Sequence, residues 1–144
     1  MAEDNCLFCR IVSGELPATI VYEDDDSVAF LDHRPLFHGH TLLVPRVHVE
    51  TLGELPVSLV APFFQAAQLL SLAIESALGA EGTFVAMNNR VSQSVPHLHV
   101  HVVPRRRKDG LKGFFWPRTK YKSDEEMLAV QKLIATEVKK IKSQ

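Results

Sequence analysis

Three histidines alternate with apolar residues in one short segment, His97-Leu98-His99-Val100-His101-Val102-Val103. Side chains of an extended strand alternate between its two faces, so this spacing predicts three imidazoles on one side and apolar residues on the other. Imidazole can bind a metal, act as a nucleophile or exchange a proton near neutral pH. Three uses stay open: a three-histidine catalytic zinc site, a nucleophilic histidine with helpers, and a division of the histidines between metal and chemistry.

Two cysteines, Cys6 and Cys9, lie three residues apart. This spacing is typical of one half of a structural zinc site, and His48 and His97 could complete a set of two cysteines and two histidines. A redox pair and two buried thiols are the alternatives. The N-terminal residues are acidic and polar rather than typical of a signal peptide, so we expect a cytoplasmic protein without a structural disulfide.

A polar segment precedes the three histidines, Asn88-Asn89-Arg90-Val91-Ser92-Gln93-Ser94-Val95. Its amide and hydroxyl donors could hold phosphate oxygens without a bulky cation. The alternative is an ordinary polar turn between two strands.

The composition favours one globular domain, because 46% of the 144 residues are apolar and 23% are charged. The charge is unevenly distributed. Residues 1–104 carry 4 Lys+Arg and 12 Asp+Glu, a net charge of −8, whereas residues 105–144 carry 12 and 5, a net charge of +7. The acidic part would repel phosphates, which makes nucleic acid an unlikely partner for the whole chain.

Hydrophobic patterning predicts an α+β fold with an antiparallel sheet. The predicted strands are residues 19–22, 27–31, 41–44, 83–87 and 97–103, and one long helix runs from Pro56 to Leu78. Residues 55–74 carry no charge and are long enough to cross a membrane. Polar residues recur on one helical face of this stretch, which predicts a half-buried core helix and no membrane span.

The last part of the chain, residues 105–144, is predicted to be a basic, aromatic extension of the domain formed by residues 1–104. It contains Phe114, Phe115 and Trp116, and a second helix begins at Ser123 with a capping box completed by Glu126. The extension could bind a polyphosphate or a nucleic acid strand. We favour the alternative that it packs within a dimer, with its cations near the acidic domain.

The order and spacing of these motifs resemble those of the histidine-triad (HIT) family of nucleotide hydrolases and transferases. The motif of this family contains three histidines and four hydrophobic residues, and residues 97–103 match it in full. The resemblance covers residues 6–104 and includes Ala29-Phe30-Leu31-Asp32, Gly39-His40-Thr41-Leu42-Leu43-Val44-Pro45 and Gln93-Ser94-Val95. Within the family, the chain is similar to the small nucleotide-binding members that carry a zinc-type cysteine pair.

The resemblance implies a homodimeric enzyme in which each subunit contains a five-stranded antiparallel sheet. His99 would attack the α-phosphorus of a nucleoside phosphoramidate or a dinucleoside polyphosphate, with adenine or guanine as the base. Water would then release the nucleoside monophosphate from the nucleotidyl-histidine, and no magnesium is required. The alternative from another class is a nucleotide-binding adaptor or regulatory protein with little turnover.

The resemblance also implies roles for individual residues. Those that would hydrogen-bond the phosphate or the leaving group are His101, Ser94, Asn88 and Gln93. Those that would form the nucleoside pocket are Asp32 at the ribose and Leu7, Phe8, Ile11, Phe30 and His33 at the base. Those that would bind a structural zinc ion are Cys6, Cys9, His48 and His97. One departure is that residues 89–92 form a shorter loop without the glycine of many relatives, which leaves the leaving group open.

Overall fold

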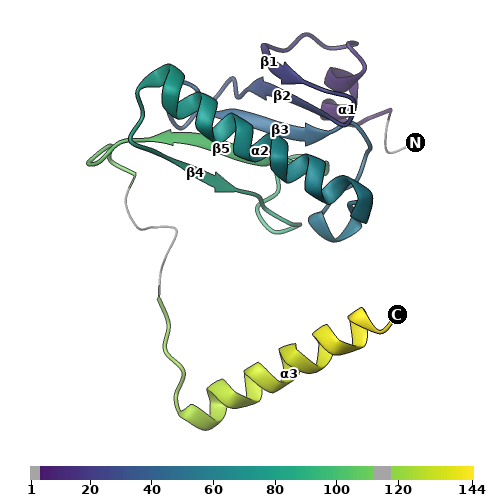
Figure 1. Cartoon of the computed structure of the whole chain (residues 1–144), viewed down its shortest axis with the longest axis vertical. Coiled ribbons are helices and arrows are strands. Elements are labelled where there is room, and N and C mark those ends of the chain that lie inside the picture. Colours follow the sequence, from purple (N-terminus) through teal and green to yellow (C-terminus); the bar gives the residue numbers. More distant parts are fainter. Residues whose placement is uncertain (1–3, 112–117) are drawn as a thin grey trace. The chain divides into compact units, whose positions relative to one another are not determined.

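The computed structural model describes residues 4–111 and 118–144 and divides the chain into two compact units (Figure 1). We call Met1–Asp109 the body and Gly110–Gln144 the tail, and each is described by itself. The three aromatic residues expected in the extension, Phe114, Phe115 and Trp116, lie outside the described residues.

The body contains a five-stranded sheet, as predicted. Its strands are β1 (Ile20–Glu23), β2 (Ser27–Leu31), β3 (Thr41–Pro45), β4 (Gly82–Ala86) and β5 (Val100–Arg105). They pair in the order β1-β2-β3-β5-β4, and every pairing is antiparallel. The expected α+β class is therefore confirmed.

The long helix α2 (Val57–Leu78) lies across one face of the sheet, as Figure 1 shows. It begins after Pro56 and ends at Gly79, whose φ of 59° is in the left-handed region that glycine adopts most readily. Its inner side packs into a core with the sheet through Phe63, Ala66, Ala67, Leu70 and Ile74. By length and composition alone, α2 is also apolar enough to cross a membrane, with a mean hydropathy of 1.7.

The two faces of the sheet serve two different apolar clusters. Leu43 and Val100 belong to the core beneath α2, whereas Phe30 and Leu42 belong to a second cluster with Phe8. Phe8 comes from a short helix, α1 (Leu7–Val12), which the sequence did not predict because fewer than two turns give no periodic signal. The histidine that pairs with Leu42 in the strand register, His101, therefore points toward the α1 side.

The strand that carries the histidines starts later than predicted. β5 begins at Val100, so only one of the three histidines is within it. Before it, the backbone N–H of Leu98 donates to the carbonyl oxygen of Val49, and that of His97 donates to Val95. These two bonds replace the sheet ladder at residues 97 and 98. Pro104, expected to close the strand, lies within it and pairs with Thr83.

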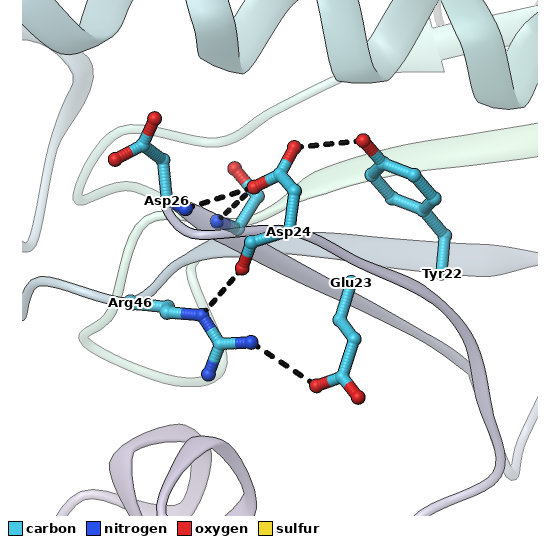
Figure 2. A network of polar contacts seen from close by, with 6 residues as sticks. Tyr22, Glu23, Asp24, Asp26 and Arg46 are labelled. Atoms are coloured by element: carbon cyan, nitrogen blue, oxygen red, sulfur yellow. Dashed lines mark hydrogen bonds and ion pairs between the residues drawn. The ribbon is translucent and has the colours of Figure 1, made fainter.

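A hydrogen-bonded network fixes the turn between β1 and β2 to the end of β3 (Figure 2). The Asp24 carboxylate accepts hydrogen bonds from the backbone N–H groups of Asp26 and Ser27, at 2.8 and 2.7 Å. The Arg46 guanidinium donates to the carbonyl oxygen of Asp24 at 2.8 Å. Because Arg46 follows β3 directly, the network holds the segment that leads to His48.

The tail contains one long helix, α3 (Asp124–Lys142). The Ser123 side chain caps it by accepting a hydrogen bond from the backbone N–H of Glu126 at 3.1 Å. The Glu126 carboxylate accepts from the backbone N–H of Lys122 rather than from Ser123, so the expected capping box is shifted by one residue on its return side.

Candidate active site and metal site

Four side chains from distant parts of the chain meet beside the sheet: Cys6, Cys9, His48 and His97. Their ligand atoms all lie within 4.8 Å of one another. His97 Nδ1 is 3.4 Å from Cys6 Sγ and 3.5 Å from Cys9 Sγ. His48 Nδ1 is 3.2 Å from both Cys9 Sγ and His97 Nδ1. These four residues, which we call the Cys/His cluster, could hold a metal ion.

The geometry of the Cys/His cluster fits a tetrahedral metal. Ligands around zinc at its usual bond lengths are separated by about 3.3 to 3.8 Å, and the separations within the cluster are close to this range. His97 Nε2 lies 2.9 Å from the carbonyl oxygen of Pro45 and must donate to it, which leaves a lone pair on Nδ1 facing the thiols. Burial lowers the pKa of His97 to about 4, so the imidazole is in its neutral, metal-binding form.

His99 is held with one ring nitrogen free. Its Nδ1 lies 2.7 Å from the carbonyl oxygen of His97, and a carbonyl can only accept, so Nδ1 carries the proton. In the neutral form of the ring, the lone pair is therefore on Nε2. The imidazole is buried, and the ring of Phe8 packs edge-on against it with the centroids 5.1 Å apart. A neutral imidazole in one fixed tautomer is the form that can act as a nucleophile.

His101 is fixed in the opposite tautomer through His40. The backbone N–H of Leu36 donates to His40 Nδ1 at 3.1 Å, so the proton of His40 is on Nε2. His40 Nε2 then donates to His101 Nδ1 at 2.9 Å, which leaves His101 with its proton on Nε2. Burial, together with the nearby His99 and His40, lowers the pKa of His101 to about 4. His101 is thus a neutral hydrogen-bond donor.

Asp32, His40 and His101 also lie close enough to bind a metal, with ligand atoms within 4.8 Å. The hydrogen bond from Leu36 argues against that use. If His40 Nε2 bound a metal, Nδ1 would carry the proton and would face the N–H of Leu36, donor against donor. We therefore interpret this group as a chain of hydrogen bonds. The Asp32 carboxylate lies 3.7 Å from His40 Nε2, where its negative charge faces the Nε2–H group.

A cleft of about 520 Å³ opens beside the two histidines. It brings together nine of the residues that the resemblance assigned to chemistry or nucleotide binding: Leu7, Phe8, Ile11, Phe30, Asp32, His33, Ser94, His99 and His101. Pro17, Ala18 and Thr19 complete its apolar wall. The lining combines apolar side chains with hydrogen-bond donors and a carboxylate, which is typical of a site for an amphipathic small molecule.

The other two expected residues, Asn88 and Gln93, do not line this cleft. Gln93 uses both ends of its amide: Nε2 donates to the carbonyl oxygen of Glu50, and Oε1 accepts from the N–H of Arg90. Asn88 donates to the carbonyl oxygen of Ser92 at 3.1 Å. In this structure both amides shape the loop rather than face the histidines.

The same loop contains unusual backbone geometry. Arg90 and Ser92 have φ angles of 72° and 61°, in the left-handed region that costs a side chain about 1 kcal/mol or more. These positions lie in the short loop without glycine noted in the sequence, so the shape that glycine would adopt freely is imposed on two other residues.

The sequence alone assigned no role to His40. It lies at the end of the loop before β3, next to a strand whose residue Leu42 pairs with His101. A histidine at the entry to an apolar strand is an unusual choice for a buried position, and that signal could have identified it.

Comparison with known proteins agrees with this site. The HIT domain family model matches residues 13–108. The adenylylsulfatase HINT3 of Arabidopsis thaliana is 40% identical over 76% of this chain, and the matched region covers 56% of that protein's length. The adenosine 5'-monophosphoramidase hnt1 of Schizosaccharomyces pombe is 33% identical over 94% of this chain and 99% of its own. A zinc-bound histidine triad protein from Mycobacterium smegmatis has 35% identity and a TM-score of 0.72, over 93% of this chain and 99% of its own.

The chain therefore belongs to the HIT domain family. At the level of the family, these relatives support a nucleotide hydrolase.

The lowered pKa of His101 predicts a pH dependence of stability. In the folded state His101 stays neutral down to about pH 4, whereas in the unfolded chain it takes up a proton below about 6.5. We expect its contribution to the free energy of unfolding to decrease as the pH falls from about 6.5 to about 4. The His101→Gln variant should show a shallower pH dependence in denaturant titrations. His38→Gln, which changes an exposed histidine, is the control, and an equal slope in His101→Gln and wild type would refute the assignment.

Proposed function

We propose that the protein hydrolyses a nucleotide at its α-phosphate through a nucleotidyl-His99 intermediate. The observation that carries the proposal is the fixed tautomer of His99, whose proton is on Nδ1 and whose Nε2 lone pair is free at the cleft. A catalytic zinc ion bound by all three histidines is not favoured, because His97 directs Nδ1 to the thiols and Nε2 to Pro45.

The reaction would proceed in two displacements. In the first, His99 Nε2 forms a bond to the α-phosphorus as the bond to the leaving group breaks. The leaving group departs with the electron pair, and an amine leaving group takes up a proton from solvent. In the second, water forms a bond to phosphorus as the P–N bond breaks. His99 regains its lone pair, the nucleoside monophosphate leaves, and the proton of water is released to solvent.

Neutral donors would stabilise the charge that develops on the phosphate. His101 presents Nε2–H, and its tautomer is fixed by His40. Ser94 lines the same cleft and offers a hydroxyl. Donors that are already oriented stabilise an oxyanion without reorganising during the reaction, so these groups need no magnesium for that purpose.

The apolar side chains of the cleft, with Asp32, would hold the nucleoside. Asp32 carries a carboxylate at the wall, where it could accept hydrogen bonds from both ribose hydroxyls. Phe8 and Phe30 pack edge to face with ring centroids 5.4 Å apart, and with Leu7 and Ile11 they offer apolar surface for a base. His33 also lines the cleft.

The names of two relatives support a proposal for the substrate class. An adenylylsulfatase and an adenosine monophosphoramidase both release adenylate from an acidic or an amine leaving group. We propose an adenosine phosphoramidate or a related adenylyl compound as the substrate, with a dinucleoside polyphosphate as the further candidate.

Trapping experiments test the intermediate. Wild-type protein mixed with labelled adenosine phosphoramidate and quenched within a turnover should carry labelled adenylate, and His99→Ala should carry none. We expect the substitution to lower turnover by at least about 10³-fold, because it removes the nucleophile. His38→Ala is the matched control and should keep wild-type turnover. Nucleotide binding without turnover in the wild type would instead indicate an adaptor, and parallel assays with adenylyl sulfate and diadenosine polyphosphates identify the leaving group.

We also propose that the Cys/His cluster binds a structural zinc ion. A bound zinc would hold His97 in place, and the carbonyl oxygen of His97 orients His99. The support is the set of ligand types, their spacing and the proton that His97 donates to Pro45.

Elemental analysis of the purified protein tests the zinc site independently of activity. We expect about one zinc per chain in wild type and less than about half in His48→Ala, because one of four ligands is lost. His38→Ala should keep the wild-type zinc content. Full zinc occupancy in His48→Ala would show that the metal, if any, is bound elsewhere.

The body is further proposed to form a homodimer through β4 and α2. β4 is the last strand in the order of the sheet, and an edge strand is a common place for one subunit to meet another. Next to it, the outer side of α2 exposes apolar residues, including Leu72 at 62% and Val57 at 89%. A broad apolar surface beside an edge strand is typical of a subunit interface.

Sedimentation equilibrium tests this interface. Leu72→Glu places a charge on the exposed apolar side of α2 and is expected to raise the dimer dissociation constant by at least about tenfold. Leu36→Glu alters an exposed leucine in the loop before β3 and should leave it unchanged. Equal dissociation constants for the two variants would place the interface elsewhere.

A further inference from the structure

Helix α3 has an apolar stripe along one side. The intervals between its residues are the same from the N-terminal end as from the C-terminal end. Its members are Met127, Val130, Ile134, Val138 and Ile141. Successive steps of three, four, four and three residues keep them within one narrow side of a helix. Because the pattern is symmetric about Ile134, the stripe is complementary to a copy of itself running in the opposite direction.

The stripe is exposed. Met127, Ile134 and Ile141 are 45%, 61% and 64% exposed, and none of the residues of α3, all of which the structure describes, is buried. Helices in proteins are stabilised mainly by the packing of an apolar side rather than by their intrinsic propensity. The stripe therefore needs an occupant.

The charges of α3 are separated along its axis. The first turn carries Asp124, Glu125 and Glu126, and the last turn carries Lys139, Lys140 and Lys142. With Lys132 and Glu137, the helix has four acidic and four basic residues and no net charge. Because α3 has no net positive charge, it is attracted only weakly to an anionic lipid surface or to the acidic body. Neither is therefore favoured as the occupant of the stripe.

We propose that α3 pairs antiparallel with α3 of a second copy of this chain. In that arrangement Ile134 meets Ile134 of the partner subunit at the two-fold axis, and Met127 meets Ile141 of the partner subunit. Val130 meets Val138 of the partner subunit. The interface is isologous, which is the form that a two-fold dimer requires.

The flanking charges fit the antiparallel direction. Asp124 and Lys142 lie on one flank of the stripe, whereas Glu126 and Lys140 lie on the other. In an antiparallel pair like flanks face each other, so Asp124 lies near Lys142 of the partner subunit and Glu126 near Lys140 of the partner subunit. A parallel pair would place acidic turns together and basic turns together, and would also align the helix dipoles. The pairing does not depend on the proposed hydrolase activity.

Cross-linking of the full-length chain tests the axis. Ile134→Cys, treated with a short bifunctional maleimide, should give a covalent dimer in most chains, because the two residues meet at the axis. Thr136→Cys, on the opposite side of α3, is the matched control, and wild type reports any reaction of Cys6 and Cys9. Cross-linking of Ile134→Cys no greater than that of Thr136→Cys would overturn the proposal.

A charge exchange tests the direction and the source of the partner. Lys142→Glu should raise the dissociation constant measured by sedimentation equilibrium by about threefold or more, and adding Asp124→Lys should restore it, since the ion pair is then reversed. A parallel pair would show no such rescue. Wild-type protein is also centrifuged with vesicles of phosphatidylcholine and phosphatidylserine. No sedimentation of protein with the vesicles is expected, and binding that Ile134→Asp abolishes while Thr136→Asp retains would overturn the proposal in favour of a membrane.

Discussion

The hydrogen bond from His99 Nδ1 to the carbonyl oxygen of His97 is the contact on which the candidate site depends. It fixes the lone pair of His99 on Nε2. The residue that provides the acceptor is itself held twice, by Pro45 and by the thiols of the Cys/His cluster. Two sites with different chemistry, a metal site and a reactive imidazole, thus share one residue, whose side chain serves the first and whose backbone serves the second.

The sheet explains how one strand can supply both a core and a site. The residues of β3 and β5 alternate between the core beneath α2 and the side of α1. On the α1 side, His40 and His101 are buried enough to stay neutral, yet they lie beside a cleft. Burial and hydrogen bonding therefore act together: the first suppresses the charge, and the second selects which nitrogen carries the proton.

The sequence predicted most of this arrangement where a repeating pattern was present. Alternation and helical periodicity located the five strands and α2, and the spacing of Cys6 and Cys9 pointed to their meeting with His48 and His97. Features set by single tertiary contacts were not predicted. The start of β5 depends on the bond from Leu98 to Val49, and the use of Gln93 within its own loop depends on Glu50, which is distant in the sequence. The tautomer of His101 likewise depends on a backbone N–H in another segment.

The Cys/His cluster also has a consequence for the way the chain folds. Cys6 and His97 are separated by 91 positions, so joining them closes a loop that includes nearly all of the body. Closing so long a loop has a large entropic cost, and a ligand set of this kind is complete only when both ends of the loop have met. During synthesis the fourth ligand emerges last, after α2 and four strands. Binding of a metal would then follow the folding of most of the body rather than initiate it.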